Sequence, residues 1–160
     1  MDASKKEDMD KLNICLAHFS NYCNWNSYDN YLYAKQYAGL QTLNKNSVGT
    51  YNNFAQTDSL LYVLHTYFMY LKFGFGRCAQ DVCRDIRLGR ISRNEGIELI
   101  IELDEKYPKE YEEAFLDYYD MTKKEFHAVI DTFANKEILE KRDGLWRKKK
   151  DFVKEYLKKE

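Results

Sequence analysis

Proline and glycine are scarce in this sequence. One proline and seven glycines occur among 160 residues, whereas a fold rich in tight turns needs more of both. Their scarcity favours long helices over a turn-rich β architecture. No run approaches the roughly 20 apolar residues that cross a membrane, and the charged residues 1–11 precede no run of signal-peptide length. We therefore expect a cytoplasmic protein with no membrane partner.

Metal-binding cysteine spacing and a strong net charge are missing too. The four cysteines, at positions 15, 23, 78 and 83, lack the C-x-x-C spacing of zinc sites, so we expect reduced thiols and no metal. The formal net charge of −1 argues against wholesale nucleic-acid binding. Charge is nevertheless uneven, because residues 72–94 carry six Lys or Arg against two Asp. An anionic ligand is therefore expected at this segment.

The sequence is rich in aromatic residues and in helical periodicity. Fourteen Tyr and nine Phe offer large apolar rings that suit clefts and interfaces as well as cores. With 44% apolar residues, we predict one compact all-α domain over residues 1–160, with six to eight helices. The expected helices span about 7–23, 27–38, 57–73, 77–88, 92–106, 109–119 and 122–133.

Capping residues mark the starts of several of these helices. Ser27 is an expected N-cap, and Thr57 or Asp58 is another. Residues 92–95 and 122–125 have the Ser/Thr-x-x-Glu pattern of capping boxes. These signals predict where the helices begin.

The helix over 57–73 is expected to be the centre of the core. His65 lies within its wide apolar stripe and is interpreted as a satisfied core histidine in preference to a catalytic base. The preceding loop, residues 41–56, is long, and it is either a lid or binding loop or a plain surface excursion. The stripe comprises Leu60, Leu61, Leu64, Tyr67, Phe68 and Leu71.

The end of the chain permits two structures. Asp143-Gly144 stands between apolar residues and predicts a short β-hairpin near 138–147. A final helix over about 150–158 fits the pattern of apolar residues equally well.

Cations and glycines gather between two expected helices. The helix that begins after Gly76 would present free backbone N–H groups beside a guanidinium, as anion sites do. It is expected to bury Ala79, Val82, Cys83 and Ile86, and to turn its charged residues elsewhere. A purely structural turn is the alternative. The predicted phosphate- or substrate-binding residues are Lys72, Gly74, Gly76, Arg77, Arg84 and Arg87.

Several segments together resemble a known family. The most specific is Lys72-Phe73-Gly74-Phe75-Gly76-Arg77, followed at a fixed distance by Arg84-Asp85-Ile86-Arg87. The other segments are 24–39, 49–51, 91–96, 107–108, 121–126 and 143–146. Across about residues 24–146 the chain resembles the C-terminal part of the bacterial N-acetyl sugar amidotransferases of lipopolysaccharide and nonulosonate biosynthesis. The resemblance implies a role in the synthesis of surface polysaccharides.

The family belongs to the ATP-dependent enzymes of the PP-loop type. Such an enzyme adenylates the carbonyl oxygen of a sugar N-acetyl group, and ammonia from a glutaminase partner then gives an acetamidino group, with loss of AMP and pyrophosphate. The resemblance implies that Lys72 and Arg77 hold pyrophosphate or a sugar-nucleotide phosphate, and that Arg84 and Arg87 hold the remaining charge. The side chains expected to stack on the sugar or base are Trp25, Tyr28 and Tyr51.

The PP-loop itself is absent. The sequence contains no glycine pair, whereas a phosphate cradle needs backbone N–H groups freed by glycines. ATP and Mg are therefore expected only with a PP-loop partner domain, and no catalytic residue or bound cofactor is assigned to this chain alone. The other expected partners are a glutaminase subunit and a nucleotide-sugar substrate.

Two other functions are compatible with the sequence. The first is a non-catalytic helical module that binds a partner protein through its aromatic surface, and the second, weaker one is a nonfunctional remnant. The identity of the sugar and the presence of a homo-oligomer are left open. So is the choice between a split half, a truncated product and an independent module.

Overall fold

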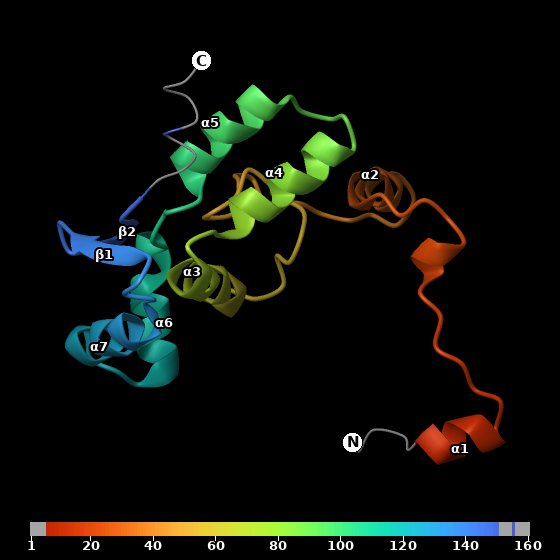
Figure 1. The fold of residues 1–160 in the computed structure, drawn as a ribbon, viewed down its shortest axis with the longest axis horizontal. Helices are drawn as coiled ribbons and strands as arrows, with labels where there is room; N and C mark the ends of the chain where they lie inside the picture. The colour runs from red at the N-terminus through yellow and green to blue at the C-terminus, as the bar shows by residue number, and fades with distance from the viewer. Residues whose placement is uncertain (1–5, 151–154, 156–160) are drawn as a thin grey trace. The chain divides into compact units, whose positions relative to one another are not determined.

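The computed structural model describes residues 6–150 and residue 155. In that part of the chain there are seven α-helices, two short 3-10 helices and one two-stranded antiparallel sheet (Figure 1). The predicted all-α class, the helix number and the short hairpin are thereby confirmed. The chain divides into two units, residues 1–41 and 42–160, and each is described by itself. The single-domain expectation stays a prediction.

The N-terminal unit contains α1 (Lys6–Lys11), the 3-10 helix η1 (Phe19–Asn21) and α2 (Ser27–Tyr37). The predicted helix over 7–23 is wrong beyond α1. Asn13 takes a positive φ of 52°, which a right-handed helix cannot continue. Leu12 and Leu16 are exposed, and an apolar stripe that no partner covers gives a helix little stability.

The start of α2 differs by one residue from the prediction. Asn26, and not Ser27, is the N-cap, because its side-chain oxygen accepts hydrogen bonds from the backbone N–H groups of Tyr28 (3.0 Å) and Asp29 (3.5 Å). Asparagine and serine are equally good caps, so the sequence alone does not choose between neighbours.

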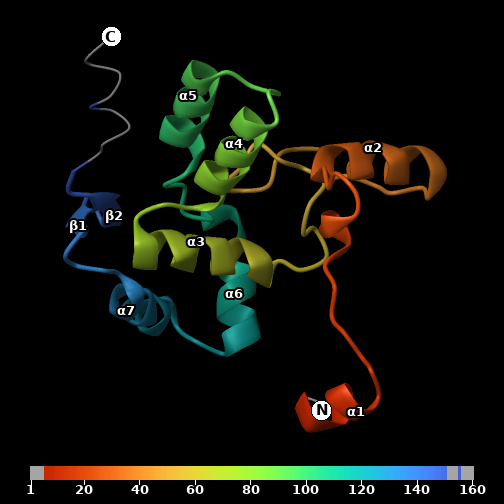
Figure 2. The ribbon, with the colours of Figure 1, turned by 45° about the vertical axis from the view of Figure 1, so that its right-hand side comes forward.

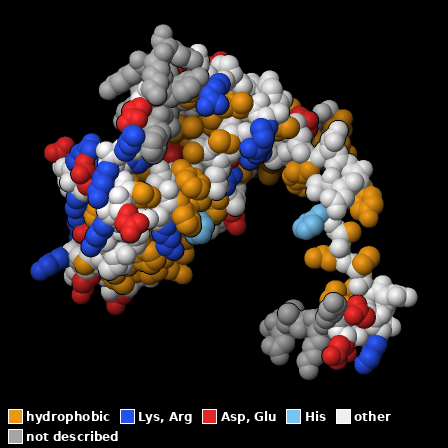
Figure 3. All heavy atoms as spheres, viewed as in Figure 1, with side chains coloured by type: hydrophobic (Ala, Val, Ile, Leu, Met, Phe, Trp, Pro, Cys, Tyr) orange, Lys and Arg blue, Asp and Glu red, His pale blue; other side chains and the backbone are white. Residues whose placement is uncertain are grey.

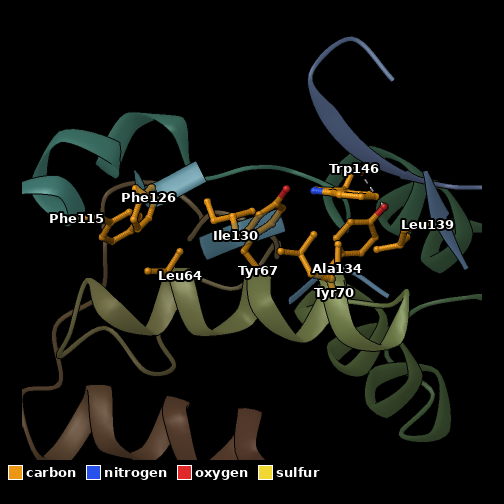
Figure 4. Packing of buried hydrophobic residues seen from close by; sticks show 10 residues of the cluster. Leu64, Tyr67, Tyr70, Phe115, Phe126, Ile130, Ala134, Leu139 and Trp146 are labelled. Carbon is orange, nitrogen blue, oxygen red and sulfur yellow. Dashed lines mark hydrogen bonds between the residues drawn. The ribbon is translucent and has the colours of Figure 1, made fainter. Parts of the chain in front are cut away.

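The main core of the C-terminal unit is built on α3 (Leu61–Phe73). Figure 4 shows Leu64, Tyr67 and Tyr70 along one face of this helix, opposite side chains from the later helices and the hairpin. The predicted central role of this helix is confirmed, although it begins at Leu61 and not at residue 57 or 58. The partners across the core are Phe115, Phe126, Ile130, Ala134, Leu139 and Trp146.

His65 points away from this core. It is exposed, and its ring lies 5.8 Å from that of Tyr62. The interpretation as a core histidine is wrong, because His65 lies about 100° around the helix from Leu64, on the edge of the buried stripe.

A second apolar cluster lies between α4 (Arg77–Arg87) and α5 (Arg93–Leu103). The two helices approach closely at Gly96, where a Cβ atom would lie 2.6 Å from Cγ1 of Val82. The buried face of α4 is rotated from the predicted one. Cys83 is exposed, whereas Cys78, Asp81 and Asp85 are buried. Asp81 and Asp85 accept hydrogen bonds from Thr50 and Tyr51, which are distant partners that the sequence did not reveal.

The rest of the C-terminal unit covers the core face of α3 (Figure 2). Its elements are η2 (Lys109–Tyr111), α6 (Glu112–Tyr119), α7 (Lys123–Phe133), β1 (Leu139–Arg142) and β2 (Leu145–Lys148). Asp143 and Gly144 both have positive φ angles, of 51° and 77°, as a type I′ hairpin turn requires. Both predicted capping boxes are formed. The predicted helix over 150–158 lies almost entirely outside the described residues.

None of the described helices combines the length and the apolar character that crossing a membrane would require.

Candidate functional site

Two buried carboxylates organise the predicted anion-binding segment. Asp81 and Asp85 lie one turn apart on α4, with 1% and 2% of their surface exposed. A buried charge is costly unless it is paired and hydrogen-bonded. Three arginines supply the pairing, and we call the group formed by Arg77, Asp81, Arg84, Asp85 and Arg90 the α4 charge cluster.

The arginines of the α4 charge cluster share the two carboxylates. Asp81 accepts Nε of Arg77 at 3.0 Å and Nη2 of Arg84 at 3.1 Å. Asp85 accepts Nη1 of Arg90 at 3.0 Å and Nε of Arg84 at 3.4 Å. Three cations against two anions leave a formal charge of +1. The printed ion pairs use much of this positive charge within the cluster and hold the arginine side chains in fixed orientations.

The loop before α3 is attached to the same carboxylates. The hydroxyl of Thr50 donates to Asp81 at 2.7 Å, and the hydroxyl of Tyr51 donates to Asp85 at 2.6 Å. Thr50 and Asn52 are buried. The loop is therefore part of the packed structure and not a plain surface excursion.

Arg77 is the most enclosed cation of the cluster. Its side chain is 14% exposed, and Nη1 donates to the Tyr62 hydroxyl at 2.5 Å and to the Gln56 side chain. Burial would lower the pKa of the Arg77 guanidinium, but the charge and hydrogen bond of Asp81 outweigh it and raise the pKa. Burial raises the pKa of Tyr51, and its hydrogen bond to Asp85 raises it further. Arg77 thus stays charged and Tyr51 stays a donor.

The N-terminus of α4 binds an anion, but the anion belongs to the chain. The carboxylate of Asp104 accepts the backbone N–H of Gly76 at 2.8 Å and that of Ala79 at 2.9 Å. A Cβ atom at position 76 would lie 2.9 Å from the carbonyl oxygen of Asp104, so the approach needs glycine. A phosphate group would reach these N–H groups only after Asp104 had left them. Gly74 instead ends α3 with a positive φ of 74°.

Lys72 and Arg87 keep their side chains at the surface. The Lys72 ammonium lies 4.9 Å from the ring centroid of Phe133, and Arg87, on the described part of the chain, makes no hydrogen bond or ion pair. Ten residues of helix separate Arg77 from Arg87 by about 15 Å. The structure therefore brings Arg77 and Arg84 together around Asp81, but does not gather all the predicted cations on one phosphate group.

The predicted stacking residues fall in different units. Trp25 is exposed and Tyr28 is half-buried, with its ring 5.6 Å from that of Tyr31 in the N-terminal unit. Tyr51 belongs to the C-terminal unit, where its ring packs on the apolar cluster of Cys78 and its hydroxyl bonds Asp85. Stacking by Tyr51 would therefore have to use the exposed part of a packed ring.

A second polar cluster, around Glu112, was not predicted from the sequence. Glu112, buried at the start of α6, accepts hydrogen bonds from Tyr107 (2.5 Å), Lys123 (2.5 Å) and His127 (2.8 Å). His127 itself is half-buried. The available signal was the i,i+4 spacing of Lys123 and His127, which puts both on one face of α7.

This second cluster lies on the wall of a cavity of about 1010 Å³. The cavity extends from the end of α5 to the hairpin, and Figure 3 shows Lys, Arg, Asp and Glu side chains intermixed on the hairpin side of the C-terminal unit. None of the predicted binding residues lines it. We call it the Glu112 cavity.

Comparison with known families gives a match to the LPS biosynthesis protein WbpG-like, C-terminal domain, over residues 48–154. The match covers more than half of the chain. The chain belongs to this family. No curated protein matches it.

The WbpG-like domain contains both polar clusters. Residues 48–154 include Lys72, the α4 charge cluster, Tyr51 and the Glu112 cavity, whereas Trp25 and Tyr28 precede the matched residues. Membership confirms the resemblance to the C-terminal part of a lipopolysaccharide biosynthesis family, and it associates the chain with that process.

Proposed function

We propose that this WbpG-like domain is the helical C-terminal part of an ATP-dependent N-acetyl sugar amidotransferase, and that it acts with a separate PP-loop domain. The observation that carries the proposal is the match to the C-terminal domain of a lipopolysaccharide biosynthesis protein. The sequence adds that no glycine pair is available for a phosphate loop. The chain alone is therefore expected to be inactive towards ATP.

In this proposal the partner domain performs the chemistry and this chain binds the substrate. The PP-loop domain, with ATP and Mg, would adenylate the acetamido oxygen, and ammonia from a glutaminase subunit would displace AMP to leave the acetamidino group. The α4 charge cluster would hold the phosphates of the nucleotide sugar. Arg84 suits this task because two buried carboxylates fix its orientation while its side chain remains 30% exposed. Cations that are already held in position need little reorganisation when a negatively charged phosphate binds or when negative charge develops on it.

Lys72 and Arg87 would contribute as outer contacts. Both carry exposed cations, and the length of α4 places Arg87 too far from Arg77 for both to bind one phosphate. A nucleotide sugar, with its diphosphate and further polar groups, can contact cations that are spread along a helix. A single inorganic phosphate cannot.

Reconstitution tests the proposal. The chain is mixed with a PP-loop domain, a glutaminase, ATP, Mg and a UDP-linked N-acetyl sugar, and AMP release and the mass of the sugar are measured. We expect AMP release and replacement of the acetamido oxygen by nitrogen only when the chain is present. Arg84→Gln should lower the rate by roughly tenfold or more, whereas Lys124→Gln, on an exposed residue of α7, should not. An equal rate without the chain would refute the proposal.

A second candidate function is a protein-interaction module. The N-terminal unit exposes several large apolar side chains, and such residues often mark contact surfaces. Light scattering of the full chain tests this function. A monomer whose mass does not change when the PP-loop domain and the glutaminase are added would argue against it. The exposed residues include Leu12, Leu16, Phe19, Tyr22 and Trp25.

A further inference from the structure

Four large apolar side chains are exposed around the C-terminal end of α3. Phe73 and Phe75 stand on either side of the left-handed turn at Gly74, with 60% and 44% of their surface exposed, and their rings stack with centroids 5.9 Å apart. Ile138 lies beside this turn, since a Cβ atom at Gly74 would lie 3.0 Å from its Cδ1. Phe133, the last residue of α7, is also exposed. Exposed apolar side chains that cluster in this way often mark contact surfaces.

Three lysines lie among these apolar side chains. The ammonium group of Lys72 lies over the ring of Phe133. Lys149 donates its backbone N–H to the carbonyl oxygen of Ile138 at 3.0 Å, and its ammonium group donates to the carbonyl oxygen of Lys136 at 2.7 Å. All three lysines are exposed. Among the described residues, none of the three forms an ion pair with a carboxylate.

We call this group the Phe73 surface. Glu137 is the acidic residue of the same segment, so three lysines against one glutamate leave a formal charge of +2. The net charge of −1 of the whole chain has little influence here, because physiological salt screens exposed charges beyond about 8 Å. The Phe73 surface comprises Lys72, Phe73, Phe75, Phe133, Lys136, Ile138 and Lys149.

The residue types of the Phe73 surface indicate the kind of partner. Protein interfaces are enriched in Arg and depleted in Lys, whereas every cation of this surface is a lysine. A second copy of the chain in a two-fold dimer would bring like charges together. The interfacial region of an anionic lipid bilayer, in contrast, accepts Phe side chains without a complementary pocket and attracts lysines through its headgroups.

We propose that the Phe73 surface binds the surface of an anionic lipid bilayer. Phe73 and Phe75 enter the boundary between headgroups and acyl chains, and the lysines contact anionic headgroups. Apolar insertion and a basic patch are the two signals that together anchor a peripheral protein. The sequence-based expectation of no membrane partner rested on the lack of a spanning run, which peripheral binding does not need. Such binding goes beyond the proposed amidotransferase function and is independent of it, although Lys72 is common to both proposals.

Cosedimentation of the full chain with vesicles tests the charge contribution. Vesicles of phosphatidylcholine alone are compared with vesicles of phosphatidylcholine and phosphatidylglycerol in equal parts, called mixed vesicles here. We expect binding to mixed vesicles to be roughly tenfold stronger or more, and to weaken as salt is added. Lys136→Gln should weaken binding to mixed vesicles roughly fivefold. Lys124→Gln, which removes an exposed cation outside the Phe73 surface, should leave it unchanged.

Two substitutions at Phe73 test the apolar contribution. Phe73→Ala should weaken binding to mixed vesicles roughly tenfold, whereas Tyr118→Ala, at an exposed aromatic residue of α6, should not. In Phe73→Trp the added indole should shift its emission to shorter wavelength on mixed vesicles and be quenched by brominated acyl chains. The wild type, with Trp25 and Trp146, gives the background, and Tyr118→Trp is the matched control.

Three results would overturn the proposal. The first is that the wild type does not bind mixed vesicles. The second is binding that Phe73→Ala and Lys136→Gln both leave unchanged, because residues outside the Phe73 surface would then be responsible. The third is binding without a change in the Phe73→Trp emission. If vesicles are not bound but Phe73→Ala weakens a complex with the PP-loop domain, the Phe73 surface is a protein interface and not a membrane contact.

Discussion

Replacing Asp81 by alanine should destabilise the C-terminal unit severely. The carboxylate is 1% exposed and accepts hydrogen bonds from Thr50, Arg77 and Arg84. Its removal leaves the guanidinium of Arg77 with only Tyr62 and Gln56 as neutral partners. Breaking a buried ion pair from one side costs about 3–5 kcal/mol, and we expect the free energy of unfolding to fall by that amount.

The size of the loss in the free energy of unfolding distinguishes a buried ion-pair network from an exposed surface pair. Lys106 and Glu102 provide the matched control, since their side chains are 50% and 68% exposed and lie 3.5 Å apart at i,i+4 spacing. Such a pair contributes about 0.2–1 kcal/mol. Glu102→Ala should therefore cost several times less than Asp81→Ala.

Urea unfolding of the single and double variants is the assay. If the penalty in Asp81→Ala comes from an uncompensated Arg77, adding Arg77→Met should recover part of the stability, and the double-mutant cycle should give a coupling of roughly 1–3 kcal/mol. Amide exchange should also become faster around Thr50, which loses its partner. A cost no larger than that of Glu102→Ala, or strictly additive single losses, would refute the reasoning.

Three further perturbations test separate features. Gly76→Ala should cost about 1–3 kcal/mol in urea unfolding, because the new Cβ would meet the carbonyl oxygen of Asp104 at 2.9 Å. A maleimide should label exposed Cys83 quickly in the native protein and leave Cys78 unlabelled, since burial raises the pKa of the Cys78 thiol to about 12. Because the pKa of Glu112 falls from 4.5 to about 2 on folding, its stabilisation is present above pH 4.5 and is lost as the pH approaches 2. Thermal unfolding between pH 5 and 2 should therefore show a shallower acid loss in Glu112→Gln than in the wild type. Equal slopes would show that Glu112 does not contribute to the acid loss.

Features set by local chemistry could be predicted from the sequence. The capping box at Ser92 needs only a serine followed three residues later by a glutamate, and the turn at Asp143 and Gly144 needs only two residues that tolerate positive φ. A wide apolar stripe at helical spacing predicts the core helix α3. These signals are contained within a few residues, so no knowledge of the tertiary structure was needed.

Features set by distant partners could not be predicted. The buried face of α4 includes Asp81, whose partner Thr50 lies 31 positions earlier, and periodicity ranks an aspartate as a surface residue. The burial of Glu112 could not be predicted for the same reason, since its partner His127 comes from another helix. The failure at residues 12–23 has the opposite origin, because there the spacing was helical but no partner covered the stripe.

At the N-terminus of α4 the local signal was correct, but the group that satisfies it lies far away in the sequence. Gly76 and the free N–H groups after it predicted an anion there, and an anion is present, but it is the carboxylate of Asp104. A helix start satisfies its donors equally well with an internal carboxylate or with a phosphate, so the local pattern cannot distinguish a binding site from a packing contact. The distinction depends on a residue 28 positions away. A ligand phosphate at α4 must therefore use guanidinium groups such as those of Arg84 and Arg87, because the backbone donors at the helix start are already taken.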